Sequence, residues 1–396
     1  MNGKKIWVVQ TGEPFSFDNS GRVMRGQLVA DYFKARGAFV SVFTSRFFHQ
    51  KRALRNATAQ FNHEGIDFYL LDSCGYGSSI SIKRIVDHFQ LAINFIVTVL
   101  RFKISKPNFI FLGYPPVELA FVVSLYAKAR RIPIILDVKD QWPIIFERGL
   151  GFLPRPIVRI LITPFHWMAK FCLREASLVT TISCSFKDWV LGYSNRSDCE
   201  RFLVLPLCAP RKNFSADQVS KTHLNSLVYF GSFTEVYDFS AFACAFKKVL
   251  KIYPDLRFVF GGTGPKLDQV LELFSEIPNS EYVGYLDQDG VAAHYSSAIA
   301  SIAPFRALSD FRLAIPNKIG ESINYRVPVL SALKGEVELL LQGGGGVAVF
   351  SDTPECWEKA LHRAIKNRDA LVANIERVID RFDFEANMQH LNERMS

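Results

Sequence analysis

The sequence predicts an α/β protein built from two doubly wound domains. Apolar runs of strand length alternate with helical patterns, and this alternation starts a second time after a polar, Pro-containing stretch at residues 195–225. The chain of 396 residues is long for one domain, and hydrophobic residues make up 49% of it, enough for two cores. We therefore expect a first domain at 1–205, a second at 206–375, and a C-terminal helix at 376–396 that can pack back on the first domain.

The first domain is expected to begin with the buried strand IWVVQ, followed by the loop TGEPFSFDNSGR and a helix that ends at Gly37. A second strand–helix–strand unit follows further along the chain. Such repetition is typical of a parallel sheet with helices on both faces. The expected elements are a strand at 6–10, a helix at 23–36, strands at 39–43 and 108–112, a helix at 117–128 and a strand at 133–138.

The second domain repeats this alternation after the polar stretch, which we interpret as a linker. The Gly-rich segment QGGGG lacks the spacing of a phosphate-binding loop and does not directly follow a strand, so we interpret it as a turn. The expected elements are strands at 227–230, 257–260, 281–283, 300–303, 327–331 and 347–350, helices at 239–252 and 266–274, a helix that starts at Pro316, and a helical tail at 353–396.

Composition excludes several classes of protein. No apolar run approaches the roughly 20 residues that span a bilayer, and the N-terminus is unlike a signal peptide, so we expect a cytoplasmic protein. The seven cysteines include no C-x-x-C pair, and the eight histidines form no ligand cluster. We expect buried thiols in a reducing compartment, and neither a disulfide framework nor a protein-held metal.

The formal net charge of +9 favours anionic partners. Residues 83–106 and 153–174 combine Lys and Arg with aromatic and aliphatic side chains, a composition typical of segments that lie on an anionic membrane surface. The alternative is a pair of core-packed helices whose basic ends reach water. No RNA-binding aromatic motif or zinc finger is present, so nucleic acid is not an expected partner.

Ligands of doubly wound sheets bind outside the carboxyl ends of the strands. The stretch AIPNKIGESINYRVPVL, residues 314–330, follows one such strand. Pro316 is suited to a helix start, and Ile319 and Ile323 would face the sheet while Lys318 and Glu321 share another stripe. A Lys in the first turn opposes the helix dipole, which suggests an anionic ligand there. The alternative is an exposed Lys on an ordinary helix.

Several motifs in this order and spacing resemble the C-terminal half of a family-4 glycosyltransferase of the two-Rossmann-domain type. They are FVFGGTGPKLDQV (258–270), EYVGYL (281–286) and FRLAIPNKIGESINYRVPVLSALKGE (311–336). Residues 11–45 and the motif DVKDQWP (137–143) resemble the subgroup that builds O-antigens, capsules and exopolysaccharides. The resemblance covers nearly the whole chain and implies the GT-B architecture, two Rossmann-like domains facing a cleft.

The resemblance also implies roles for single residues. Glu321 would hold the ribose hydroxyls of the donor nucleotide, and Lys318 would contact the diphosphate. The remaining donor-site residues implied in the second domain are Ser232, Gly262, Gly264, Pro265, Tyr285, Arg312 and Asn317. In the first domain, Gly21 and Arg22 would belong to a loop facing the diphosphate and the acceptor.

The chain departs from the family pattern in three places. Leu313 stands where many members have a first Glu, the GSFTEVY turn (231–237) lacks the usual Arg and Lys, and Lys139 stands where many relatives have His. The negative charge of the leaving group would then be stabilised by Lys318, together with Arg306, Arg312 and helix N–H groups. Asp140 is either an acceptor-side polar group at the reacting centre or a structural cap.

The resemblance implies a retaining, metal-independent transferase without a cofactor. It would move a sugar from a nucleotide-diphosphate donor, with UDP favoured over GDP, to a lipid-linked saccharide acceptor at the inner face of the cell membrane. Two alternatives stay open: a UDP-sugar 2-epimerase on the same fold, and a non-catalytic homologue that binds nucleotide or acts as a scaffold at the membrane.

Overall fold

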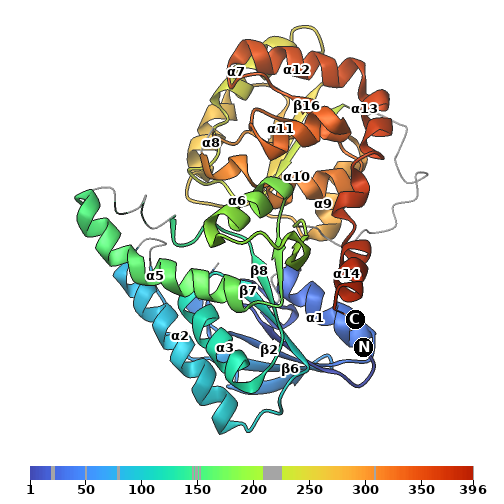
Figure 1. Ribbon diagram of the computed structural model, residues 1–396. Helices are drawn as coiled ribbons and strands as arrows, with labels where there is room; N and C mark the ends of the chain where they lie inside the picture. Colours follow the sequence, from blue (N-terminus) through green and yellow to red (C-terminus); the bar gives the residue numbers. More distant parts are fainter. Residues whose placement is uncertain are drawn as a thin grey trace. The chain divides into compact units, whose positions relative to one another are not determined.

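A computed structural model describes residues 1–18, 23–49, 51–77, 81–144, 147, 150, 153–207, 225–306 and 309–395 (Figure 1). The chain divides into two compact units, Met1–Leu205 and Pro206–Ser396. Each unit has its own sheet, and no strand is shared between the two sheets. The units are therefore described one at a time.

The first unit contains an eight-stranded sheet in the order β10-β9-β8-β7-β1-β2-β6-β5. All neighbouring strands are parallel except β5, which pairs antiparallel with β6. The strand order reverses between β1 and β7, which defines the switch point of this sheet. The strands are β1 Lys5–Val9, β2 Phe39–Ser45, β5 Gln60–His63, β6 Ile66–Leu71, β7 Phe109–Tyr114, β8 Ile134–Val138, β9 Leu178–Thr181 and β10 Phe202–Val204; β3 Phe47–Phe48 and β4 Ala53–Leu54 form a separate hairpin.

Helices connect these strands, and α2, α3 and α5 lie together on one face of the sheet (Figure 1). Ser81 and Ser183 begin α2 and α6 as N-caps, because their hydroxyl oxygens accept hydrogen bonds from backbone N–H groups inside the helix. The helices are α1 Arg25–Ala35, α2 Ile82–Arg101, α3 Val117–Arg130, α5 Arg155–Glu175 and α6 Cys184–Ser194.

The linker predicted at residues 195–225 is wrong at its beginning. Phe202–Val204 forms strand β10, which pairs in parallel with β9 at the edge of the first sheet. Phe202 and Leu203 are buried, so their apolar surface supplies the stability that this short strand needs. Residues 208–224 of the predicted linker lie outside the described part of the chain.

The second unit contains a six-stranded, fully parallel sheet in the order β13-β12-β11-β14-β15-β16. Its switch point lies between β11 and β14, where the order reverses. Each of the six strands expected from the sequence is present, with shifts of one or two residues at the ends. They are β11 Ser226–Phe230, β12 Arg257–Gly261, β13 Ser280–Tyr282, β14 Ala298–Ile302, β15 Val329–Ser331 and β16 Gly346–Ala348.

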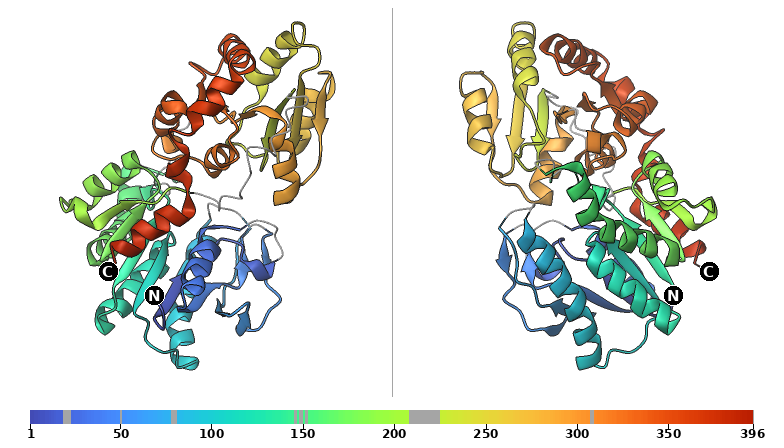
Figure 2. Two further views of the ribbon diagram at one scale, coloured as in Figure 1. Left: turned by 90° about the vertical axis from the view of Figure 1, so that its right-hand side faces the viewer. Right: turned by 60° about the vertical axis from the view of Figure 1, so that its left-hand side comes forward.

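Helices cover both faces of this second sheet, and Figure 2 shows them from two directions in yellow to red. On one face, Phe242 of α7, Phe258 of β12 and Trp357 of α12 pack in one aromatic core. On the other, Ile319 and Ile323 are fully buried, as their spacing predicts. The helices are α7 Ser240–Val249, α8 Leu267–Ser275, α9 Gln288–Ser296, α10 Asn317–Asn324, α11 Glu336–Leu340, α12 Pro354–Lys366, α13 Arg368–Ile375 and α14 Phe384–Glu393, with short helical turns at Ser309–Arg312, Leu341–Gly345 and Ile379–Phe382.

The observed architecture is the predicted one, two doubly wound α/β units. In the described ranges, no helix is long and apolar enough to cross a membrane. The expectation of buried thiols is wrong for most cysteines. All six cysteines that the structure describes are free, and only Cys172 is buried; Cys74, Cys184, Cys199 and Cys244 are exposed.

Candidate functional site

In the second unit, three turns at the carboxyl ends of neighbouring strands contact one another through their backbones. After β11, the N–H of Gly231 donates to the carbonyl of Gly261 at 3.0 Å. After β12, the N–H of Gly262 donates to the carbonyl of Gly284 at 2.7 Å. This edge of a parallel sheet is where doubly wound folds bind ligands. The three turns are therefore the backbone of a candidate ligand site.

Two glycines of these turns have no room for a side chain. Gly262 has a φ of 131°, and a Cβ there would lie 1.8 Å from the carbonyl oxygen of Gly231. Gly264 has a φ of 155°, and its Cβ would lie 2.2 Å from the carbonyl oxygen of Phe233. Such positions accept only glycine, and glycine leaves the main chain open to a close ligand approach. The sequence-based choice of Gly262 and Gly264 thus falls on the residues that shape this edge.

Lys318, in the first turn of α10, is buried beneath the turn that follows β11. Its side-chain nitrogen donates to the carbonyl of Phe230 at 2.5 Å and lies 3.3 Å from the centre of the Tyr229 ring. A Cβ on Gly231 would be 2.5 Å from the same nitrogen. The alternative of an exposed Lys is wrong, because Lys318 is only 6% exposed. The side chain supports the Gly231 turn at the switch point, and a direct contact with a diphosphate stays a prediction.

Glu321 lies one turn further along α10 and is half-buried. Its carboxylate lies near Tyr295 of α9: burial raises the pKa of Tyr295, and the negative charge of Glu321 raises that pKa further. The Tyr295 hydroxyl is 3.1 Å from the Ser322 hydroxyl oxygen. The Tyr295–Ser322 contact joins α9 to α10 beside Glu321, whose role toward a ribose stays a prediction.

The other predicted donor-site residues of the second unit occupy the rim of the same edge. Ser232 and Pro265 are exposed in the turns after β11 and β12, and Tyr285 is exposed directly after Gly284, whose φ of 76° allows the tight turn. Asn317 is the first residue of α10. Arg312 is exposed at the end of a short helical turn, and its carbonyl oxygen lies 2.2 Å from where a Cβ on Gly335 would be.

Two further cations lie beside the turn after β11, each with an acidic neighbour. The Lys266 ammonium is 2.8 Å from the Glu235 carboxylate, and an Arg306 guanidinium nitrogen is 3.7 Å from the Asp238 carboxylate. These four side chains line one small hollow in the second unit. Because the charges are paired, this hollow adds little net positive charge to the site.

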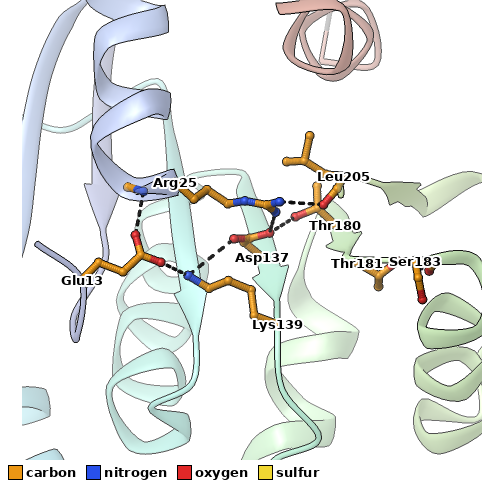
Figure 3. Close-up of polar contacts among 9 residues, drawn as sticks. Glu13, Arg25, Asp137, Lys139, Thr180, Thr181, Ser183 and Leu205 are labelled. Carbon is orange, nitrogen blue, oxygen red and sulfur yellow. Dashed lines mark hydrogen bonds and ion pairs between the residues drawn. The ribbon is translucent and has the colours of Figure 1, made fainter. Parts of the chain in front are cut away.

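In the first unit, a buried ion pair joins the N-terminus of α1 to the end of β8 (Figure 3). The Arg25 guanidinium donates to the Asp137 carboxylate at 2.8 Å and to the carbonyl of Leu205, also at 2.8 Å. The Thr180 hydroxyl donates to the same Asp137 oxygen at 2.7 Å. Asp137 is fully buried, so these contacts replace its hydration.

Glu13 and Lys139 extend this network, as Figure 3 shows. One Glu13 oxygen accepts from the backbone N–H of Gly26 at 2.8 Å, and the other lies 2.5 Å from the Lys139 ammonium. Lys139 is also 3.9 Å from Asp137. The network fixes the loops after β1 and β8 and the start of α1 with two positive and two negative charges. We call Glu13, Arg25, Asp137, Lys139 and Thr180 the first-unit network.

Sequence reasoning named the two loops of this network but missed Glu13, Arg25 and Asp137 as members. The available signal was Asp137, a carboxylate inside the otherwise apolar strand IILDV. Asp140 follows Lys139 and is exposed. Its acceptor-side role stays a prediction. Gly21 and Arg22 lie outside the described residues. Among the described side chains, no group of three or more His, Cys, Asp or Glu could hold a metal ion.

Part of the second unit is similar to a known protein family. Residues 225–367, which run from β11 through α12, match the family model described as glycosyl transferases group 1. A search of curated protein sequences found no match. The match lies wholly in the second unit and covers the three glycine turns and α10.

Solved structures extend the likeness to the whole fold. Sucrose-phosphate synthase from Thermosynechococcus elongatus aligns over 99% of both chains with a TM-score of 0.72 and 14% identity. HepE from Anabaena, solved in complex with UDP, aligns over 99% of both chains with a TM-score of 0.63 and 15% identity. A protein from Listeria monocytogenes described as a UDP-N-acetylglucosamine 2-epimerase aligns over 99% of this chain and 96% of its own, with a TM-score of 0.61 and 10% identity. The chain has the GT-B fold, as predicted.

Proposed function

We propose that this chain is a retaining glycosyltransferase that uses a nucleotide-diphosphate sugar, with UDP as the nucleotide. The observation that carries the proposal is the position of the group 1 domain match, which covers the turns at Gly231, Gly262 and Gly284 and helix α10. The HepE structure contains bound UDP, so a chain of this fold accommodates that nucleotide. This supports UDP as the nucleotide of the sugar donor here.

The proposed reaction develops negative charge on the departing diphosphate while the sugar becomes oxocarbenium-like. Backbone N–H groups of the α10 N-terminus would stabilise that charge, because they are fixed before the reaction begins. The exposed guanidinium of Arg312 would add a positive charge near the diphosphate. The Lys318 ammonium would contribute its charge from beneath the Gly231 turn. We propose that these groups replace a divalent metal in the reaction.

The acceptor is proposed to bind to the first unit. The first-unit network holds the loops after β1 and β8, and Asp140 directly follows Lys139 with a carboxyl whose pKa is raised by desolvation. We propose that Asp140 contacts the acceptor hydroxyl of a lipid-linked saccharide, with surface polysaccharide as the final product. Transfer would take place at the inner face of the cell membrane.

Replacing Glu321 with Ala tests the donor site. If its carboxylate binds the ribose hydroxyls, the variant loses a charge-assisted hydrogen bond worth about 1.5–3 kcal/mol. The initial rate of UDP release from a UDP-sugar should then fall at least roughly tenfold, since about 1.4 kcal/mol corresponds to tenfold. Glu272→Ala, which removes an exposed carboxylate on α8, should retain the wild-type rate. Equal rates in both variants, with the fold intact, would contradict the ribose role.

Replacing Lys318 with Met separates a phosphate effect from a packing effect. Met keeps the apolar stem beside Tyr229 but removes the ammonium beneath Gly231. We expect the affinity for UDP to fall on the order of tenfold and that for uridine far less, because the lost charge acts on phosphate. Titration calorimetry with both ligands measures this. Equal loss for UDP and uridine would mean that Lys318 only supports the fold.

A UDP-sugar 2-epimerase is the second candidate, and the likeness of fold to the Listeria monocytogenes protein favours it. The two activities leave different products from the same donor. A transferase releases UDP and requires an acceptor, whereas an epimerase changes the configuration of the sugar at C2 without needing one. NMR of a UDP-N-acetylhexosamine incubated without acceptor distinguishes them. Binding of UDP with neither product would indicate the non-catalytic alternative.

A further inference from the structure

One face of α2 carries a continuous row of exposed apolar side chains. They recur every three or four residues, so they lie on one stripe of the helix. Their exposed fractions run from 45% to 80%, although the opposite face of the same helix packs into the core of the first unit. The row consists of Ile82, Val86, Phe89, Ile93, Val97 and Leu100.

The apolar surface continues onto α5 in the same layer of helices. The Phe89 ring on α2 lies 6.3 Å from the Phe165 ring on α5, and Phe121 on α3 lies 5.2 Å from Trp167 on α5, measured between ring centres. Figure 1 shows α2 in light blue and α5 in green along the same side of the first unit. The exposed apolar residues of α5 are Ile157, Ile160, Leu161 and Trp167. We call the exposed apolar residues of α2 and α5 together the α2–α5 face.

The charged side chains at exposed positions of α2 and α5 are all positive, and one neighbouring carboxylate, Glu147, pairs with His166 of α5 at 2.6 Å. Lys83 and Arg101 flank the row on α2, and a second row on α5 follows helical spacing at Arg155, Arg159, Lys170 and Arg174; all six side chains are exposed. By contrast, the three acidic residues of α2, α3 and α5 are withdrawn from the surface. Asp87 and Glu118 are buried, and Glu175 is paired with Lys128 at 2.9 Å and with Arg174 at 3.3 Å.

We propose that the α2–α5 face docks on an anionic lipid bilayer. Exposed aliphatic and aromatic side chains bordered by Lys and Arg, with no exposed acidic residue on α2, α3 or α5, match a surface that is apolar inside and negative at the headgroups. A second copy of this chain fits the charge less well, because a symmetric interface places the same basic rows against each other. The basic rows attract the protein to the membrane, and the apolar residues enter it.

Co-sedimentation with vesicles tests the docking. The full chain should pellet with phosphatidylcholine vesicles that contain phosphatidylglycerol, and at least roughly tenfold less with phosphatidylcholine alone. Binding should weaken as salt is raised, since the screening length falls from about 10 Å at 0.1 M to about 3 Å at 1 M. Failure to bind the anionic vesicles at low salt overturns the proposal.

Trp167 provides an internal probe of insertion. It is 61% exposed, whereas Trp7, Trp142 and Trp357 are buried and Trp189 is partly buried, so its emission is the most sensitive to a new apolar environment. Anionic vesicles should shift the tryptophan emission to shorter wavelength. The Trp167→Phe variant should still co-sediment but lose most of this shift. A wild-type emission that is unchanged in the bound state would exclude insertion at α5.

Two sets of variants separate attraction from insertion. Replacing Arg155, Arg159, Lys170 and Arg174 with Gln should lower the partition coefficient at low salt by up to about fivefold per residue. The matched control replaces Lys247, Lys251, Lys359 and Lys366 of the second unit with Gln, which removes the same charge from exposed positions elsewhere and should leave most binding intact. Equal loss in both sets would show attraction by net charge alone and contradict a specific face.

The insertion variant is Ile93→Ser with Val97→Ser, two exposed positions whose substitution leaves the core of α2 in place. We expect its binding to anionic vesicles to fall roughly tenfold or more, with thermal unfolding unchanged and with unchanged release of UDP from a UDP-sugar in the presence of a soluble acceptor analogue. Because folding and activity are measured separately, failure of the docking proposal is distinguishable from failure of the proposed activity. A wild-type dimer in light scattering that this variant makes monomeric would assign the face to a second copy of the chain.

Discussion

UDP binding should be abolished when Gly262 is replaced by Ala. The residue has a φ of 131°, and the added Cβ would meet the carbonyl oxygen of Gly231 at 1.8 Å. The oxygen is a main-chain atom and the Cβ is bonded directly to main chain, so neither can move without opening the contact between the turns after β11 and β12. The backbone strain alone costs about 1–3 kcal/mol. Calorimetric titration of the variant with UDP checks this result.

The matched control is Gly192→Ala in α6. No atom lies within 4 Å of the Cβ that this change adds, and the helix geometry suits Ala, which is favoured over Gly there by roughly 0.5–1 kcal/mol. The control should keep UDP affinity and unfold at the same or a slightly higher temperature. If Gly262→Ala binds UDP as tightly as this control, the glycine turns are not the nucleotide site.

Asp137→Asn should cause the largest loss of stability in the first unit. The change leaves the shape of the side chain but removes the charge that balances Arg25, 2.8 Å away in a buried position. Removing one partner of such a pair costs about 3–5 kcal/mol, because an unpaired charge stays buried. The free energy of unfolding from denaturant titration, followed by a probe in the first unit, measures the loss.

Two further variants show whether burial is the cause. Lys128→Gln breaks an exposed pair with Glu175 in the same unit and should cost at most about 1 kcal/mol. The double change Arg25→Met with Asp137→Leu removes both charges, so it should recover a substantial part of the stability lost in Asp137→Asn. Equal costs for Asp137→Asn and Lys128→Gln would contradict the described burial of the first-unit network.

Much of the fold follows from local sequence patterns. The strands of the second unit were predictable because each is a short apolar run followed by a turn or helix signal, and Ile319 and Ile323 face the core as their spacing requires. In the first unit, the strands β5, β6, β9 and β10 and the β3–β4 hairpin were missed. β5 is a half-exposed edge strand, and β10 has only three residues within a polar stretch, so both depend on a neighbouring strand for their pairing.

The candidate site was predictable only where one segment defines it. Gly262 and Gly264 follow their strand directly, and a Gly-rich turn between a strand and a helix is visible in the sequence. The position of Lys318 was not visible, since its ammonium bonds to Phe230, 88 residues earlier. The same holds for Arg25 and Asp137, which are 112 residues apart. Contacts between distant segments require the folded sheet before they can be recognised.

The central claim is sugar transfer from a UDP-sugar, and release of UDP tests it most directly. The full chain is incubated with a panel of UDP-sugars and a membrane lipid extract containing lipid-linked saccharides, with and without a chelator, and UDP is quantified over time. We expect one donor to give acceptor-dependent UDP release that the chelator leaves unchanged, with the sugar recovered on the lipid fraction in its original anomeric configuration. Absence of acceptor-dependent UDP release across the panel, while the protein is folded and binds UDP, would contradict transfer.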